Sequence, residues 1–336
     1  MTGTTTASVT EQPDAGEFQR RTAPYRRELT AHCYRMLGSL HDAEDQVQET
    51  YLRAWRAYDG FEGRSSLRTW LYRIATNTCL TALEQRGRRP LPTGLGAPAD
   101  DPEAPVTAAP EVPWLEPAPE TLFAAEETPG RAVDPAAVVA HRESTRLAFV
   151  AALQYLPARQ RAVLLLRDVL KWRAAEVAEL LGTSVASVNS ALQRARARLR
   201  EAAPERDAVT EPGDPAARAL LDAYARALEE GDIAAFVAVL RRDAVWEMPP
   251  YPEWYRGAEV IGRLVRAKCD PAPGKLRMRP TAANGQPAFA MYRRDDRGVY
   301  RPFQLQVLTL ADGRVARVAS FFDTRLYRAF DLPDEG

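Results

Sequence analysis

RQRAVLLLRDVLKWRAAEVAELLGTSVASVNSALQRARARLR spans residues 159–200, and its apolar residues recur at the three-to-four-residue spacing of helices. Gly182 and Ser184 interrupt this pattern between two helical runs. Glycine can adopt the left-handed conformation that ends a helix, and serine can accept the free amides that begin the next one. A helix, a short glycine turn and a second helix predict a helix-turn-helix.

The second predicted helix carries small and polar side chains first and arginines later. Base edges are read by hydrogen-bonding side chains near a helix N-terminus, whereas phosphates require cations alongside. The predicted DNA-contacting residues are Ser184, Ala186, Ser187, Asn189, Ser190, Gln193, Arg194, Arg196 and Arg198. Residues 141–200 contain eleven Lys/Arg and four Asp/Glu within a chain of formal net charge +0. This local basic charge favours nucleic-acid binding over a helical hairpin with a solvated basic face.

The whole chain has 336 residues, enough for two or three domains. Its three cysteines are far apart and show no metal-ligand spacing, so we expect no metal, no cofactor and a reducing compartment. No apolar run approaches the roughly 20 residues of a membrane span. The polar residues 1–16 do not resemble a signal peptide and predict a disordered tail. We therefore expect a soluble, cytoplasmic protein.

Proline and charge divide the chain into modules. Eleven prolines fall in residues 90–135, and residues 91–130 contain eight acids and no Lys or Arg. This composition predicts an extended acidic linker over residues 90–140. Around it we expect an all-helical module at 17–89, the helix-turn-helix module at 141–202, a short linker at 203–215 and a last module at 216–332.

The first module carries two further signals. Ser39 is predicted to cap a helix over residues 42–55, which opens with acidic residues and keeps an outward polar face. In residues 61–77, aromatic side chains alternate with arginines. Such a segment can stack on unpaired bases while it holds the phosphates, or its aromatics can belong to the core.

Residues 32–77, HCYRMLGSLHDAEDQVQETYLRAWRAYDGFEGRSSLRTWLYRIATN, resemble region 2 of sigma-70 family transcription initiation factors. Residues 159–200 resemble region 4 of the same family. No region 3 lies between them, and in this respect the chain resembles the extracytoplasmic-function (ECF, group 4) subfamily. It is most similar to the members of that subfamily that carry a C-terminal SnoaL-like domain.

The resemblance implies partners and site residues. The polymerase beta-prime clamp helices would contact Asp42, Asp45, Gln48, Glu49 and Leu52. The minus-ten element would be melted and held by Phe61, Arg64, Ser65, Ser66, Arg68, Trp70, Arg73 and Asn77. Region 4 would bind the beta flap and the double-stranded minus-thirty-five element. An anti-sigma factor or a small ligand are further candidate partners, and a membrane is not. The acidic linker would run toward the polymerase cleft, where it could mimic nucleic acid.

In residues 216–332 two predicted helices precede four strand-like runs, near residues 244–248, 288–293, 301–310 and 315–322. This α+β order resembles the SnoaL-like, nuclear-transport-factor-like cone. The candidate pocket residues are Trp246, Met248, Trp254, Tyr255, Asn284, Gln286, Tyr292 and Gln304. A filled core that packs against the sigma modules is the alternative. Because no histidine follows His141, an acid/base pair using histidine is excluded there; Asp243, Glu247 and Asp323 remain as carboxylates.

These features predict a non-enzymatic promoter-specificity subunit of RNA polymerase with a regulatory C-terminal domain. Two other classes remain open: a ligand-binding repressor or activator that acts without polymerase, and a SnoaL-class enzyme with a DNA-binding anchor. The acidic helix together with the aromatic and arginine segment favours the sigma factor.

Overall fold

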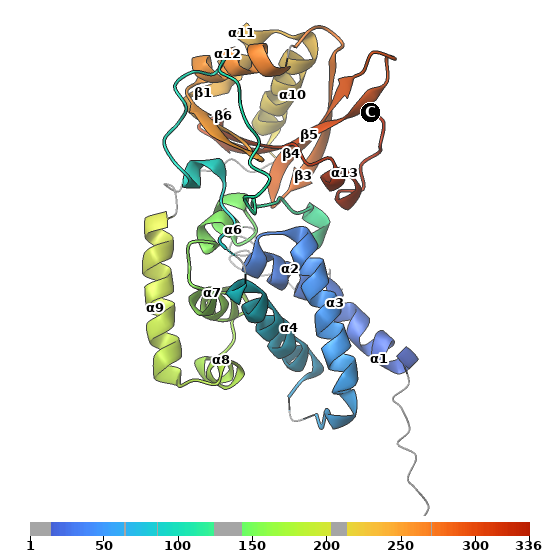
Figure 1. The fold of residues 1–336 in the computed structure, drawn as a ribbon, viewed down its shortest axis with the longest axis vertical. Coiled ribbons are helices and arrows are strands. Elements are labelled where there is room, and N and C mark those ends of the chain that lie inside the picture. The colour runs from blue at the N-terminus through green and yellow to red at the C-terminus, as the bar shows by residue number, and fades with distance from the viewer. Residues whose placement is uncertain (1–14, 64, 86, 124–142, 203–213, 270) are drawn as a thin grey trace, which may run out of the picture.

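The structure is a computed structural model that describes residues 15–63, 65–85, 87–123, 143–202, 214–269 and 271–336. Two helical modules lie together in the lower part of Figure 1, and an α+β module lies above them. The predicted fold class, a multidomain chain of two helical modules followed by an α+β cone, is confirmed. The predicted tail at residues 1–16 falls mostly outside the described residues.

The first helical module contains four helices: α1 (Ala15–Thr22), α2 (Arg26–Leu37), α3 (Leu40–Arg56) and α4 (Leu67–Glu84). Gly38, at φ 72°, ends α2 in the left-handed conformation. The amide of Asp42 donates to Ser39 Oγ (3.1 Å), so the predicted cap of α3 is confirmed.

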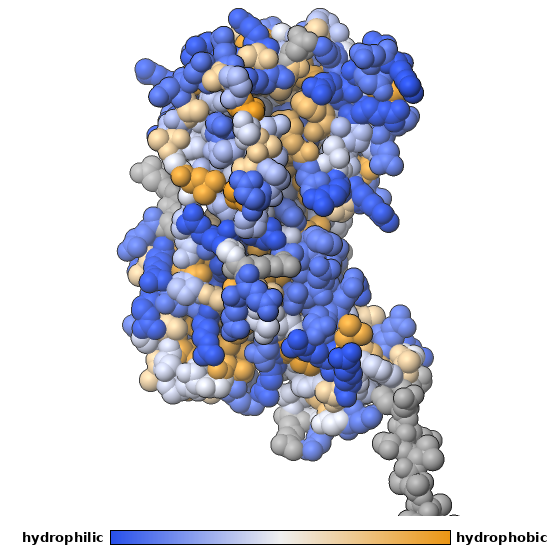
Figure 2. All heavy atoms as spheres, in the orientation of Figure 1, coloured by the Kyte–Doolittle hydropathy of each residue, from blue (hydrophilic) through white to orange (hydrophobic). Residues whose placement is uncertain are grey.

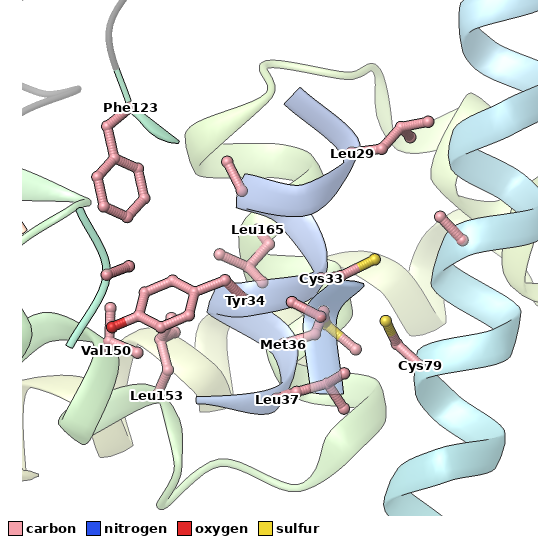
Figure 3. Close-up of a cluster of buried hydrophobic side chains, with 14 of the residues drawn as sticks. Leu29, Cys33, Tyr34, Met36, Leu37, Cys79, Phe123, Val150, Leu153 and Leu165 are labelled. Carbon is pink, nitrogen blue, oxygen red and sulfur yellow. The ribbon is translucent and has the colours of Figure 1, made fainter. Parts of the chain in front are cut away.

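Helix α2 is the central element of the helical half of the molecule. Nine of its twelve residues are buried, which requires partners on more than one side of the helix. Figure 3 shows Cys33 facing Cys79 of α4, while Tyr34 lies among Phe123, Val150 and Leu153. The cores of the two helical modules are therefore continuous around α2.

The second helical module contains α6 (Leu147–Leu153), α7 (Ala158–Leu164), a π-helical turn (Leu165–Val169), α8 (Ala174–Leu181) and α9 (Val185–Ala202). Gly182, at φ 60°, ends α8, and the amide of Ser187 donates to Ser184 Oγ (3.1 Å) at the start of α9. Both predicted features of the helix-turn-helix are confirmed.

The C-terminal module combines α10 (Pro215–Glu230), α11 (Ile233–Val239), α12 (Ala258–Cys269) and α13 (Arg325–Ala329) with one sheet. The strands are β1 (Leu240–Met248), β2 (Tyr251–Arg256), β3 (Leu276–Ala283), β4 (Gln286–Arg294), β5 (Tyr300–Ala311) and β6 (Arg314–Phe321). Their order is β2-β1-β6-β5-β4-β3, in which β1 and β6 are parallel and the other neighbours antiparallel.

The sheet has six strands where the sequence predicted four. The two missed strands, β2 and β3, form the edges of the sheet, and they contain Pro252 and Pro280. Proline cannot donate to a strand ladder and is tolerated at edges, so it conceals an edge strand from pattern analysis.

The two faces of the sheet pack against different partners. One face carries Trp246, Phe289 and Leu308 and forms a core with α10, α11 and α12. The other face carries Ala290 and Leu305, which join the core that includes the helical modules. The C-terminal module is therefore packed onto the helical modules rather than tethered to them.

Linker residues 87–123 contain only two short 3₁₀ turns, but they are packed rather than free. Leu115 and Phe123, within the predicted extended linker, are buried in the helical core. A Cβ at Gly38 would lie 2.8 Å from Leu115 Cδ1, so the linker approaches the backbone of α2 closely. The linker passes in front of the C-terminal module in Figure 1.

Candidate nucleic-acid and polymerase interfaces

Helix α9 presents one buried and one open face. Val188, Leu192 and Ala195 are buried against the module core. The predicted DNA-contacting residues are all exposed: Ser184, Ala186, Ser187, Asn189, Ser190, Gln193, Arg194, Arg196 and Arg198. Polar groups thus occupy the N-terminal half of an open helix face and cations the C-terminal half, as major-groove reading requires.

Two of the α9 arginines already have partners. Arg196 holds Asp168 of the π-helical turn in a bidentate pair (2.8 and 2.6 Å). Arg194 donates to Ser190 Oγ (2.5 Å) one turn earlier on the same helix. Arg196 is therefore engaged within the protein, a restraint that the sequence did not reveal.

The outward face of α3 remains open. Asp45 and Gln48 are exposed, Glu49 accepts a hydrogen bond from Arg53 (2.6 Å), and Leu52 is 51% exposed. Leu52 is therefore an apolar side chain on an otherwise polar, open face. Asp42 differs, since it is buried and paired with Arg89, so it does not lie on this face.

The loop and helix at residues 61–77 hold the aromatic pair that the sequence singled out. The rings of Phe61 and Trp70 lie 4.9 Å apart, and both side chains are half-buried, so they belong neither fully to the core nor to the surface. Ser66 caps α4 through the amide of Thr69 (3.1 Å). Ser65 is half-buried and Asn77 exposed, while Arg64 lies outside the described residues.

The two arginines of α4 are engaged by partners that the sequence analysis did not identify. Arg68 pairs with Glu28 of α2 (2.6 Å) and lies over the Tyr72 ring at 4.8 Å. Arg73 pairs with Glu179 of α8 (2.6 Å). A predicted minus-ten contact is thus tied to the helix-turn-helix module.

Further contacts join the two helical modules. The Tyr72 and Trp172 rings meet edge to face at 5.8 Å. Arg161 donates to the carbonyl oxygen of Met36, and Arg35 Nε donates to that of Ser144 (3.1 Å). Burial lowers the pKa of both arginines to about 10.

The predicted pocket residues of the C-terminal module separate into four groups. Trp246, Met248, Tyr255 and Gln304 lie on the helix-covered face of the sheet. Tyr292 lies on the opposite face against Tyr327, and Trp254 Nε1 donates to the Gly96 carbonyl of the linker (2.9 Å).

Asn284 and Gln286 face the helical modules rather than the interior of the cone. Asn284 is fully buried at φ 54°; its Nδ2 donates to Tyr34 Oη (3.0 Å) and to the Thr145 carbonyl (2.8 Å), and its Oδ1 accepts from Ala118 N (2.8 Å). Gln286 Oε1 accepts from Leu147 N (3.0 Å). This turn therefore contacts the first module, the linker and the second module together.

The candidate carboxylates of this module are held in ion pairs. Glu247, fully buried, accepts from Arg317 (2.8 Å) and from the Thr93 amide (2.9 Å). Asp243 pairs with Arg241, and Asp323 with Arg325. Across the described residues no His/Cys/Asp/Glu group could hold a metal ion, and no helix there is long and apolar enough to span a membrane.

The open face of α9 in the second helical module, the acidic face of α3 in the first and the α+β module define a multidomain DNA-binding protein. Three family models match it: Sigma-70 region 2 at residues 23–89, Sigma-70 region 4 at residues 146–199 and the SnoaL-like domain at residues 221–318.

The ECF RNA polymerase sigma factor SigG of Mycobacterium tuberculosis is 56% identical over 321 residues, which cover 95% of this chain and 85% of that protein. SigJ of the same species is 28% identical over 247 residues, 71% of this chain and 69% of that protein. The chain belongs to the ECF sigma factors of the sigma-70 family, which are transcription initiation factors; its partners are core RNA polymerase and promoter DNA. The crystal structure of SigJ covers 95% of this chain and 99% of its own at 22% identity and TM-score 0.57, a likeness of fold.

Proposed function

We propose that this sigma factor reads the minus-thirty-five element with α9 and opens the minus-ten element with residues 61–77 while α3 binds the polymerase clamp. The observation that carries this assignment is the coexistence of two open faces on one chain, the polar and basic face of α9 and the acidic face of α3 around Leu52. It acts in the cytoplasm, where RNA polymerase works.

In vitro transcription with purified core polymerase tests this function. Transcripts from a cognate promoter should require both the polymerase and this chain. A repressor or activator of the other class would bind the same DNA without polymerase and would not direct initiation by core enzyme, and that result would contradict the assignment.

The described conformation is too compact to read both promoter elements at once. The elements are named for positions about 25 base pairs apart, or about 85 Å at ~3.4 Å per base pair. Arg73 of α4 pairs with Glu179 of α8 (2.6 Å). Only three residues separate the end of α8 from the start of α9, which is 18 residues long. No part of α9 can therefore lie more than roughly 50 Å from α4. Initiation at both elements requires the two helical modules to separate.

The C-terminal domain stabilises this closed conformation through the turn at Asn284. Replacing Asn284 with glycine removes the side chain while it keeps the left-handed backbone accessible. We expect N284G to raise transcription several-fold at limiting sigma concentration, because opening then breaks fewer buried hydrogen bonds.

The matched control is Asp312→Gly, since Asp312 occupies the same backbone conformation (φ 53°) in the exposed β5–β6 turn. It should transcribe like the unaltered chain. Equal activity of N284G and D312G would refute the closed conformation as an inhibitory state. In this proposal the C-terminal domain regulates initiation through its contacts with the helical modules and not through catalysis. Its candidate catalytic carboxylates are each paired with an arginine.

A further inference from the structure

The C-terminal module contains a second basic stretch of the chain. Residues 263–301 carry ten Lys/Arg and three Asp/Glu, in a chain of formal net charge +0. Residues 141–200, around the helix-turn-helix, carry eleven and four. The C-terminal module is thus locally as basic as the module that reads DNA, and a basic surface is the electrostatic footprint of a protein that binds a polyanion.

Six of these cations gather at one end of the sheet, called the cationic end below. They come from the neighbouring strands β3, β4 and β5, from the turn between β4 and β5, and from the residue before β3. Figure 1 marks the C-terminus of the chain here, where the Gly336 amide donates to the Tyr300 carbonyl (3.1 Å), and Figure 2 shows a hydrophilic surface at this corner of the molecule. The six residues are Lys275, which is half-buried, and the exposed Arg277, Arg293, Arg294, Arg297 and Arg301.

The cationic end lies at the opposite end of β4 from the turn that contacts the helical modules. That turn, at Asn284, precedes β4, which begins at Gln286. Arg293 lies seven residues further along the strand, or about 23 Å at ~3.3 Å per residue. The closed conformation therefore leaves the cationic end open to a partner.

Most arginines of the cationic end have no carboxylate to neutralise them. Elsewhere in this module arginines are paired, as Arg317 is with Glu247 (2.8 Å). Arg301 is paired as well, with Asp295 (3.4 Å) and Glu335 (2.8 Å). Over the part of the chain that the structure describes, four arginines lack such a partner: Arg277, Arg293, Arg294 and Arg297. Their positive charge is therefore available to an external anion.

The pairing of β4 with β5 places two cations against each other. Arg293 lies directly opposite Arg301 across the two strands. Like charges in this arrangement destabilise a sheet, and an anion beside both side chains relieves the repulsion. The Arg293 guanidinium lies over the Phe303 ring at 4.1 Å, a stacking that orients the group and leaves its N–H donors free for an acceptor.

A surface hollow gives these cations a common focus. It measures about 410 Å³ and is lined at its charged positions by Lys275, Arg293, Arg294 and Arg301, with Asp295 and Asp296 as the acids. Asp295 is already occupied, since it accepts from the amides of Arg297 and Val299 (2.9 Å each) within the turn. A phosphate group that enters the hollow meets several arginines, which bind phosphate with paired N–H donors.

Duplex DNA is the polyanion that this module cannot avoid. Promoter DNA is a partner of the chain, and Pro215 at the start of α10 follows Ala202 at the end of α9 by 13 residues. Thirteen residues span at most about 45 Å when fully extended. The C-terminal module therefore stays beside any duplex that α9 holds, at a high effective concentration.

We propose that the cationic end of the sheet is a third DNA-contacting surface, which binds the phosphates of duplex DNA without reading their sequence. Contacts to phosphate position a protein on DNA and carry no base information. The surface adds affinity to the contacts of α9 and holds the C-terminal domain against the duplex. That placement rests on the proposed function, whereas the affinity of the surface for DNA does not.

The test is a fluorescence-anisotropy titration of the purified full chain, without polymerase, into a labelled duplex that lacks promoter elements, at several salt concentrations. Arg294→Gln combined with Arg297→Gln removes two cations and keeps polar side chains. The double variant should lower the salt slope by about two and weaken binding roughly tenfold at moderate salt. Any binding by α9 is the same in both proteins and does not affect the difference.

Two further variants separate the surface from general effects of charge and folding. Arg297→Gln alone changes a side chain with no partner among the described residues, and it should lower the slope by about one. Arg218→Gln combined with Arg226→Gln makes the same change of charge at exposed positions of α10 in the same module. This control should bind DNA like the unaltered chain, and all variants should keep its melting temperature.

Two results would overturn the third surface. The first is an equal salt slope in R294Q/R297Q and in R218Q/R226Q, which would leave no specific role for the cationic end. The second is an unchanged affinity of R294Q/R297Q for DNA with a lost affinity for labelled polyglutamate, which would make the partner an acidic polypeptide. Failure of promoter-directed transcription would contradict the proposed function and leave this titration unaffected, so the two failures are distinguishable.

Discussion

His32 is 2% exposed in the core of the first helical module, and its Nε2 lies 3.0 Å from Thr76 Oγ1. Burial, with Arg35 and Arg68 nearby, lowers its pKa from 6.5 to about 3. Below pH 6.5 the unfolded chain therefore binds a proton that the folded chain excludes. The stabilisation is complete above pH 6.5 and is lost as the pH falls through 6.5 toward 3, by about 2 kcal/mol at pH 5.

Denaturant unfolding from pH 7.5 to 5 measures this effect. His32→Gln should remove most of that slope, whereas His41→Gln, a change of the exposed histidine on α3, should retain it. An identical slope in H32Q and the unaltered chain would assign the pH dependence to other groups.

Arg194 and Asn189 share the open face of α9 but should act differently on DNA. Arg194→Ala should weaken binding to all sequences and reduce the salt slope by about one, because it removes one phosphate contact. Asn189→Ala should instead change promoter preference, at about 1–3 kcal/mol if a bidentate base contact is lost. A panel of promoter variants measured at several salt concentrations separates the two, and matching profiles would refute the division.

At the scale of elements, α3 supplies the polymerase surface. Exchanging Asp45 and Glu49 together for lysine should weaken core-polymerase binding in a fluorescence titration at least tenfold, because both lie beside the exposed Leu52. Glu84→Lys, a charge reversal at the exposed end of α4, is the control. Unchanged affinity in the double variant would exclude α3 as the docking element.

Local signals in the sequence predicted the helical elements because their causes are local. Ser39, Gly182 and Ser184 act within three residues of their partners, so a short window contains both sides of each interaction. The edge strands β2 and β3 escaped although each pairs with its neighbour in sequence across a two-residue turn, because each contains a proline that weakens the strand pattern.

The site residues show the same limit. The exposed face of α9 follows from helical periodicity alone. The burial of Asp42, by contrast, depends on its ion pair with Arg89, 47 residues away. Asn284 and Gln286 belong to a turn whose partners, Tyr34 and Leu147, lie in other modules. Sequence spacing holds no information on such pairs, so these two residues could not be separated from interior residues such as Gln304.

At the scale of the whole molecule, the separation of the two helical modules is measurable. Spin labels at Gln85→Cys, at the end of α4, and Glu201→Cys, in α9, report it by double electron–electron resonance. The native cysteines interfere little with labelling, since Cys33, Cys79 and Cys269 are buried and burial raises the pKa of the Cys79 and Cys269 thiols.

The free chain should give one short distance between the labels, because the Arg73–Glu179 pair and the Asn284 hydrogen bonds hold the modules together. Core polymerase with promoter DNA should shift it by tens of ångströms, since the elements lie about 85 Å apart. N284G should populate the longer distance even without DNA, and D312G should not. A distance that stays short in an active transcription complex would show that both elements are read without opening, and the compact conformation would then be the working one.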